Sequence, residues 1–268
     1  MVTDSRILRR LTQGLVTLAG ILVYLFLALP VGVIVLSAFS PEPYPQFPPQ
    51  GISLRWFSAL MDDAGWRESL SISIILLLVV TPLTVILGTF AAWALARLEF
   101  RYRETLQAFI LSPLMIPQVV LGIALLYVLT AAGIAGLVSG LVIGHIVVAL
   151  PYVVRTVSVS LAAMDRRLEA VSMSLGAGRW YTFRHVTLPL IKPGMLAGAV
   201  FAGVTSFGEV SVSLFLSAPD TITVPVRIFN YVDQTFDPTV NAISVIFIVI
   251  AVLILLAIER TIGLVKIL

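Results

Sequence analysis

One carboxylate stands inside a long and otherwise apolar stretch of the sequence. It is Glu209, in the segment Thr-Ser-Phe-Gly-Glu-Val-Ser at positions 205–211, and hydroxyl groups flank it at Ser206, Ser211 and Ser213. A carboxylate is costly to bury in hydrocarbon, so such a residue usually faces a wet cavity or a charged partner. We predict that these four residues line a substrate path, with Glu209 as the counter-charge if the solute is a cation. The alternatives are an ion pair with a Lys or Arg of another subunit and a position nearer the outer surface.

The motifs of common catalytic and metal-binding sites are missing from the sequence. It contains no Cys, and its two His, His145 and His185, stand on different segments. The metalloprotease pattern His-Glu-x-x-His and the hydrolase pattern Gly-x-Ser-x-Gly do not occur, nor does the phosphate loop Gly-x(4)-Gly-Lys-[Ser/Thr]. We therefore predict that the chain is not an enzyme, holds no metal and has no nucleotide site of its own. His145 is expected to hydrogen-bond a neighbouring helix.

The composition predicts an all-α membrane protein. Apolar residues make up 59% of the chain and charged residues 12%, whereas soluble domains are about 25% charged. A helix needs roughly 20 apolar residues to cross a bilayer, and continuous runs of that length indicate helices rather than barrel strands. Six such spans are predicted, at Leu15–Phe39, Leu70–Ala96, Leu106–Leu129, Leu137–Val159, Met195–Leu216 and Ala242–Ile258.

The distribution of basic residues predicts the orientation of the six spans. If the N-terminus is placed in the cytoplasm, 14 of the 17 Lys and Arg residues fall on the cytoplasmic side, and only Arg55, Arg67 and Arg227 fall outside. Basic residues are enriched in the cytoplasmic loops of membrane proteins. Both termini are therefore expected in the cytoplasm.

The cytoplasmic loop between the fourth and fifth spans, residues 165–189, is predicted to fold as a helix-turn-helix. Asp165 can cap a helix whose apolar residues Leu168, Val171 and Leu175 recur at helical spacing. Gly176 and Gly178 are expected to end that helix. A second short helix is expected over Trp180–Val186, so that the unit presents a ridge of side chains to a soluble partner.

This loop resembles the cytoplasmic EAA loop of binding-protein-dependent ABC transporter permeases. The family pattern is Glu-Ala-Ala, three residues, Gly, nine residues and Ile-x-Leu-Pro. Here nine residues separate Gly176 from Val186-Thr187-Leu188-Pro189. The upstream half departs from the pattern, because the family's Glu falls on Ala170 and an acidic residue, Glu169, stands one position earlier.

The resemblance implies a single transmembrane permease domain over residues 1–268 that forms half of the solute path of an ATP-driven importer. The implied partners are a second permease subunit in a heterodimer, two ATPase subunits that bind ATP and Mg, an external solute-binding protein and membrane lipid, but no nucleic acid. The implied location is the bacterial inner membrane. The residues assigned to the ATPase contact are Glu169, Ala170, Leu175, Gly176, Arg179 and Phe183.

Two segments, 217–231 and 47–56, resemble the subgroup of these permeases that includes polyamine importers. The subgroup also contains permeases for opines, phosphonates and ferric iron, so the expected solute is a small cationic or zwitterionic amine such as a polyamine. The alternatives are a loop without a partner and an ion-gradient-driven secondary transporter. Such a transporter should show an inverted repeat and several coupling carboxylates, whereas Glu209 is the only acid placed well inside a predicted span.

Overall fold

The computed structural model describes residues 2–44, 47–235 and 237–262. All the regular elements within these ranges are helices, and one isolated β-bridge joins Gly136 to Ser217. The prediction of an all-α chain is therefore confirmed. The described residues fall into two compact units, which are treated separately below.

The first unit consists of the chain before residue 64 together with residues 234–249. It contains α1 (Val2–Ala38), α2 (Arg55–Asp62) and the first part of α13 (Thr239–Ile262). The connection from α1 to α2 folds back on itself, because the backbone N–H of Ser53 donates to the Phe39 carbonyl at 2.7 Å. The Trp56 indole fixes the start of α2 by donating to the Ser40 carbonyl at 2.9 Å.

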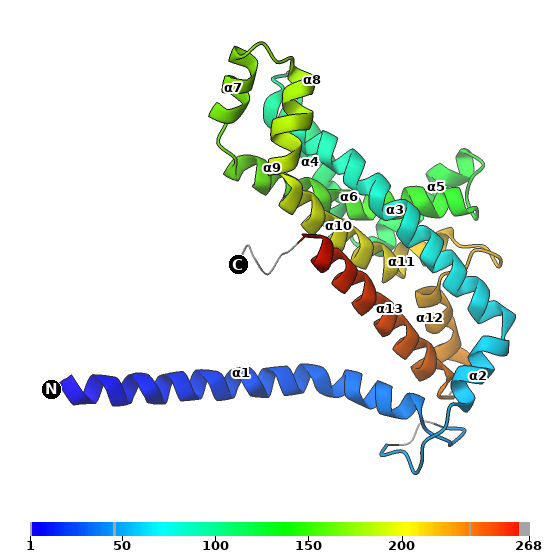
Figure 1. The fold of residues 1–268 in the computed structure, drawn as a ribbon. Coiled ribbons are helices and arrows are strands. Elements are labelled where there is room, and N and C mark those ends of the chain that lie inside the picture. The colour runs from blue at the N-terminus through cyan, green and yellow to red at the C-terminus, as the bar shows by residue number, and fades with distance from the viewer. Residues whose placement is uncertain (1, 45–46, 236, 263–268) are drawn as a thin grey trace. The chain divides into compact units, whose positions relative to one another are not determined.

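The second unit runs from residue 64 to residue 233 and includes the end of α13. Three long helices, α3, α6 and α10, form its centre (Figure 1). Its elements are α3 (Ala64–Arg97), α4 (Arg103–Leu111), η1 (Ser112–Leu114), α5 (Gln118–Ala131), α6 (Val138–Ala163), α7 (Arg167–Ser174), α8 (Arg179–Thr182), the π-helix η2 (Phe183–Thr187), α9 (Leu188–Leu190), α10 (Lys192–Phe207), α11 (Ser211–Leu216) and α12 (Val224–Gln234).

Glycine lets the three central helices pack closely. A Cβ at Gly88 of α3 would come within 2.6 Å of Val153 on α6, and a Cβ at Gly194 of α10 would come within 2.7 Å of the Thr156 carbonyl on α6. Small residues at such crossings allow backbones to approach inside a membrane, where van der Waals packing drives helix association. Fully buried side chains, including Val153, Val157 and Ile191, pack together in the core of this unit.

Membrane-spanning helices are fewer and more broken in the described residues than the sequence predicted. Three helices are long and apolar enough to span, and two bent helix pairs raise the number to five. The predicted third span, Leu106–Leu129, is bent by 111° between α4–η1 and α5. Pro113 and Pro117 lie at this bend, and proline cannot donate the backbone hydrogen bond that would continue a helix.

The predicted fifth span, Met195–Leu216, is also interrupted. α10 ends at Phe207 and α11 begins at Ser211, with Gly208, Glu209 and Val210 between them. Before α10, the chain bends by 69° where the segment through α8 and α9 meets it at Ile191. The predicted sixth span corresponds to α13, whose described apolar part, Thr239–Ile254, is shorter than a full span.

Candidate functional site

The loop predicted to lie between spans four and five folds as a helix, a tight turn and a second helix (Figure 1). Asp165 Oδ1 accepts the backbone N–H of Arg167 at 2.9 Å, close to the start of α7. At the other end of α7, Gly176 has a φ of +90°. Its N–H donates to the Met173 carbonyl, and the Ala177 N–H donates to the Ser172 carbonyl. This pair of bonds is the Schellman motif. The motif favours glycine at the position of Gly176, because the backbone there lies in the left-handed region.

The outer side of this loop is an exposed apolar surface. Leu175 at the turn is 84% exposed, and Leu168 and Val171 on α7 are exposed as well. Trp180 and Tyr181 on α8 add two exposed aromatic rings. Ala170, Gly176 and Arg179, three more of the residues predicted to contact an ATPase, are exposed too. We call the exposed residues of 168–181 the loop ridge.

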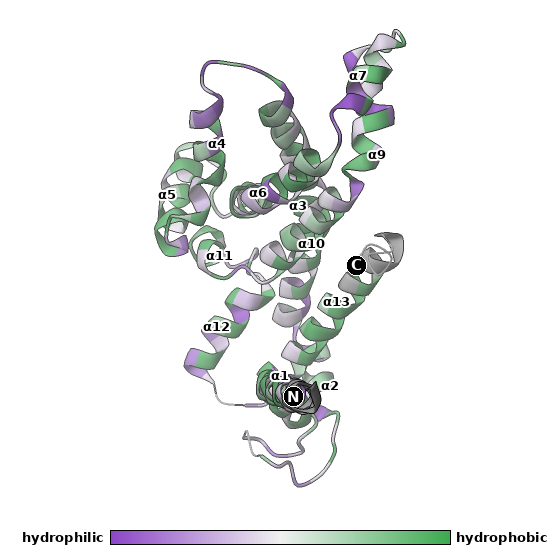
Figure 2. Ribbon diagram, turned by 90° about the vertical axis from the view of Figure 1, so that its left-hand side faces the viewer, coloured by the Kyte–Doolittle hydropathy of each residue, from purple (hydrophilic) through white to green (hydrophobic). Residues whose placement is uncertain are grey.

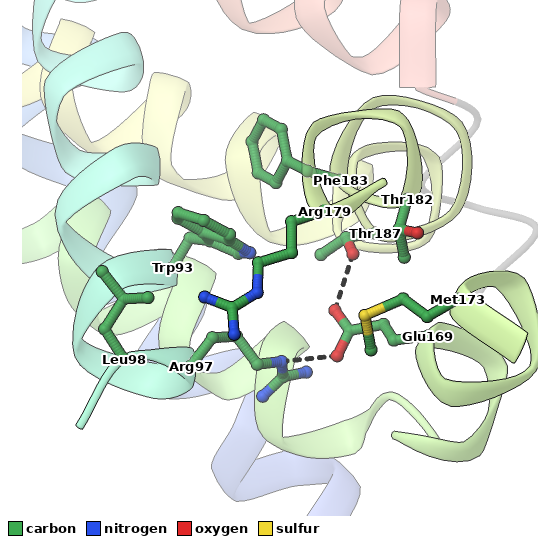
Figure 3. Close-up of a pocket in the computed structure, with 9 residues that line it drawn as sticks. All are labelled: Trp93, Arg97, Leu98, Glu169, Met173, Arg179, Thr182, Phe183 and Thr187. Atoms are coloured by element: carbon green, nitrogen blue, oxygen red, sulfur yellow. Dashed lines mark hydrogen bonds and ion pairs between the residues drawn. The ribbon is translucent and has the colours of Figure 1, made fainter. Parts of the chain in front are cut away.

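Glu169 faces inward, away from the loop ridge. Its carboxylate is held from two sides: Oε2 pairs with Arg97 Nε at 2.7 Å, and Oε1 accepts the Thr187 hydroxyl at 2.6 Å (Figure 3). Only 9% of the residue is exposed. Glu169 on α7 therefore ties the loop to the end of α3 and to the π-helix η2.

Phe183 also faces inward, where it anchors η2 on α3. Its ring lies 5.6 Å from that of Phe90 and 5.1 Å from that of Trp93, both on α3, and 5.4 Å from that of Trp180. Aromatic pairs at these separations add attraction beyond the area that they bury. A cavity of about 200 Å³ remains between this cluster and the Arg97–Glu169 pair, and Arg179 and Met173 also line it (Figure 3).

A buried polar cluster joins three helices elsewhere in the second unit. His145 on α6 is 1% exposed. Its Nδ1 lies 2.8 Å from the Ser206 hydroxyl on α10, and its Nε2 lies 2.8 Å from the Ser213 hydroxyl on α11. The expectation that His145 hydrogen-bonds a neighbouring helix is confirmed, and the bonds reach both halves of the interrupted fifth span.

Glu209 lies in the interruption itself. Its Oε1 accepts the backbone N–H of Val212 at 2.7 Å, and the residue is 5% exposed. Ser206 and Ser213 are buried, and Ser211 is partly exposed. Of the four residues predicted to line a path, Ser206 and Ser213 thus meet through His145, while Glu209 bonds the first turn of α11.

Comparison with known proteins identifies the family that has this architecture. The family described as "Binding-protein-dependent transport system inner membrane component" matches residues 84–264, more than half of the chain. The chain belongs to this family. It is a permease, the multi-pass inner-membrane component of a binding-protein-dependent ABC importer, and not the ATPase of that importer.

Two curated relatives match nearly the whole permease. It is 28% identical over 235 residues to the spermidine/putrescine transport system permease protein PotC of Escherichia coli K12, covering 88% of this chain and 89% of the relative. It is also 28% identical over 244 residues to the putative 2-aminoethylphosphonate transport system permease protein PhnV of Salmonella typhimurium LT2, covering 90% and 91%.

Two solved structures share the permease fold. A bacterial ABC transporter that imports the acidic polysaccharide alginate superposes with a TM-score of 0.74 at 15% identity, over 92% of this chain and 95% of that one. The MetNI methionine ABC transporter superposes with a TM-score of 0.60 at 20% identity, over 78% and 97%.

Sequence reasoning missed Arg97, Trp93 and Thr187, which complete the inner side of the permease loop. Arg97 is 72 residues from Glu169 along the chain, so no spacing rule could pair them. The only available signal was chemical, since a carboxylate on the inner face of an amphipathic loop helix requires a partner. Thr187 falls within the Val-Thr-Leu-Pro segment, and no local sequence pattern indicated that its hydroxyl would hydrogen-bond Glu169.

Replacing His145 by Leu is expected to lower the stability of the permease by about 1–3 kcal/mol, because two buried serine hydroxyls lose their partner. The thermal unfolding midpoint of the purified chain measures this change. His185→Leu is the matched control: His185 is exposed, its Nδ1 lies 3.1 Å from the Tyr181 carbonyl, and its ring stacks on that of Tyr181 in the same short segment. Its effect is expected to stay below about 0.5 kcal/mol. Equal shifts in the two variants would contradict a bridging role for His145.

Proposed function

We propose that this permease forms half of the solute path of an ATP-driven importer and that residues 165–189 couple it to a separate ATPase. The observation that carries the proposal is the loop ridge, an exposed apolar surface on a well-folded segment. Exposed apolar patches of this kind mark interaction sites. A segment without a partner would gain nothing from exposing Leu175, Val171 and Trp180.

The six predicted coupling residues take two different roles in this proposal. Ala170, Leu175, Gly176 and Arg179 are exposed and would contact the ATPase. Glu169 and Phe183 are buried and would hold the loop against α3. The loop could then pass a movement of the ATPase to the membrane helices as a rigid-body shift. The Arg97–Glu169 ion pair would transmit this movement to α3, and η2 would transmit it to α10.

The complete assembly that we propose has a second permease subunit, two ATPase subunits that bind ATP and Mg, and an external solute-binding protein. The structure of the similar alginate transporter contains an alginate-bound periplasmic protein, which supports the last of these.

We further propose six spans in one permease domain over residues 1–268, with both termini in the cytoplasm. The basic residues, 14 of 17 on one side, support that orientation.

The proposed solute is a small cationic or zwitterionic amine such as a polyamine. Two relatives at 28% identity are named for spermidine and putrescine and for 2-aminoethylphosphonate, all of which carry an amino group. Glu209 would supply the counter-charge within the membrane. It lies in non-helical backbone between α10 and α11, and such irregular backbone at membrane depth is tolerated where it lines a cavity or is buried in protein.

Glu209→Gln is expected to reduce amine uptake at least tenfold without loss of assembly. The amide oxygen of Gln can still accept the Val212 N–H, so the start of α11 keeps its bond and only the charge is lost. Uptake of radiolabelled putrescine by cells that depend on the complex measures the effect. Glu99→Gln, at an exposed carboxylate, is the matched control. Unchanged uptake in Glu209→Gln would remove this residue from the path.

ATP-dependent uptake by vesicles that contain the purified complex tests the proposed function as a whole. Uptake is expected to require nucleotide hydrolysis by the ATPase that co-purifies with the permease. Uptake driven by an ion gradient with this chain alone would instead identify a secondary transporter and would overturn the proposal.

A further inference from the structure

A cavity of about 490 Å³ opens where the end of α3, the start of α4 and the last turns of α6 meet. Four arginines line it: Arg97 from α3, Arg103 from α4, Arg155 from α6 and Arg166 just after α6. No acidic residue lines it. Glu99 and Glu104 lie on the neighbouring segment, which is largely hydrophilic (Figure 2), but neither belongs to the wall of this cavity.

Arg155 is the least expected of the four. It lies eight residues before the end of α6 at Ala163, roughly 12 Å along the helix axis. It is therefore inside the segment that qualifies as a membrane span, and its side chain is exposed. An arginine at such a depth requires a counter-charge or a wet surface.

Among the described residues, no carboxylate that lines the cavity serves this purpose. Arg97 is engaged by Glu169, and one Nη of Arg166 donates to the Ala96 carbonyl at 3.2 Å. Arg103 and Arg155 form no ion pair with any residue in the part of the chain that is described. The cavity therefore carries two guanidinium groups, those of Arg103 and Arg155, that no carboxylate of the described residues pairs with.

The rest of the wall is apolar or neutral. Leu95, Leu111, Val154 and Val159 form its apolar part, and Gln107 and Ser158 contribute neutral hydrogen-bonding groups. Val159 is 69% exposed on the outside of α6. A ligand that fits this wall has an anionic head and an apolar body beside it.

We propose that this cavity binds the phosphate headgroup of an anionic phospholipid at the membrane surface, with the acyl chains along α6. Guanidinium groups bind phosphate oxygens in a bidentate way, and basic pockets between membrane helices bind anionic lipid headgroups. A soluble phosphate shares the headgroup chemistry but would leave the apolar wall uncovered. The lipid satisfies both parts of the wall. Because the lipid would join α3, α4 and α6 at the base of the coupling loop, its charge would stabilise that end of the permease.

Native mass spectrometry of the purified permease tests this site. The probes are phosphatidylglycerol and phosphatidylcholine with the same acyl chains, titrated in parallel. Phosphatidylglycerol is expected to bind about fivefold more tightly or better, and Arg155→Gln is expected to reduce that preference about fivefold. Arg155→Lys keeps the charge and should retain most of the preference. Arg101→Gln is the matched control, because Arg101 belongs to the connection between α3 and α4 but does not line the cavity.

Each other outcome would overturn the proposal. Equal binding of the two lipids would exclude an anion site, and an unchanged preference in Arg155→Gln would place the lipid elsewhere. Displacement of phosphatidylglycerol by millimolar glycerol phosphate would identify a site for a soluble anion. If Arg155→Gln fails to fold, Arg103→Gln on α4 provides the same test from the opposite wall.

Discussion

Replacing Glu169 by Ala is expected to destabilise the isolated permease by roughly 3 kcal/mol, because one partner of a largely buried ion pair is removed. The side chains of Arg97 and Glu169 are each only 12% exposed. The substitution leaves the Arg97 guanidinium without a counter-charge and the Thr187 hydroxyl without its acceptor. Thermal unfolding of the purified chain, without the ATPase, measures the loss. Glu104→Ala, at an exposed acid, is the matched control.

A double-mutant cycle distinguishes an internal tie from a direct contact with the ATPase. If Glu169 acts through Arg97, the variant lacking both side chains should be less destabilised than the sum of the single variants. ATPase binding should fall in both single variants, since both detach the loop from α3. If Glu169 instead touches the ATPase, Glu169→Ala should release the ATPase while the stability of the isolated chain stays unchanged, which would contradict the role proposed here.

Replacing Gly176 by Val is expected to reduce the ATPase that co-purifies with the permease about tenfold. Gly176 has a φ of +90°, a region that a β-branched residue enters only with strain. No atom lies within 4 Å of the place where its Cβ would be, so the effect comes from backbone conformation and not from a clash. The turn should open and displace the loop ridge, while the membrane helices stay folded. The ratio of ATPase to permease after affinity purification measures this.

Gly178→Val is the matched control for the turn. Gly178 lies two residues further on, also in open space, but its φ of −71° suits any residue. The Gly178→Val variant should therefore keep most of the ATPase that co-purifies with the permease. Equal loss in both variants would show that bulk on the docking surface matters, and normal co-purification in Gly176→Val would refute the docking role of the loop.

The coupling loop could be predicted from the sequence because its structure is local. A capping Asp165, helical spacing of apolar residues and a terminating Gly176 act over a few residues each. The same reasoning could not reveal which face of α7 looks inward. Leu168, Val171 and Leu175 recur at helical spacing in the sequence, and the structure shows that they are exposed. The inward position of Glu169 depends on Arg97, which comes from a distant helix.

Pro113 and Pro117 indicate a kink in the predicted third span, but the size of that bend and the interruption at Gly208–Val210 could not be predicted from the sequence. Hydropathy is averaged over about 19 residues, so a run such as Leu106–Leu129 reads as one span even when Pro113 and Pro117 divide it. At Gly208–Val210 the break is stabilised by bonds that arise only in the folded chain, between Glu209 and Val212 and through His145. The residue types were visible in the sequence, but their partners were not.

The π-helix η2 sets the angular phase between the coupling loop and α10. A π turn holds one residue more than an α turn, and each residue advances a helix by about 100°. The wide turn therefore accommodates one additional residue within Phe183–Thr187 without rotating the segments on either side of it. If the same five residues took α geometry, everything before them would rotate by about that angle relative to α9. Phe183 would swing away from Trp93, and Glu169 would lose Thr187. The π geometry of this five-residue segment thus holds Phe183 and Thr187 where they meet Trp93 and Glu169, and it fixes the direction in which the loop ridge faces.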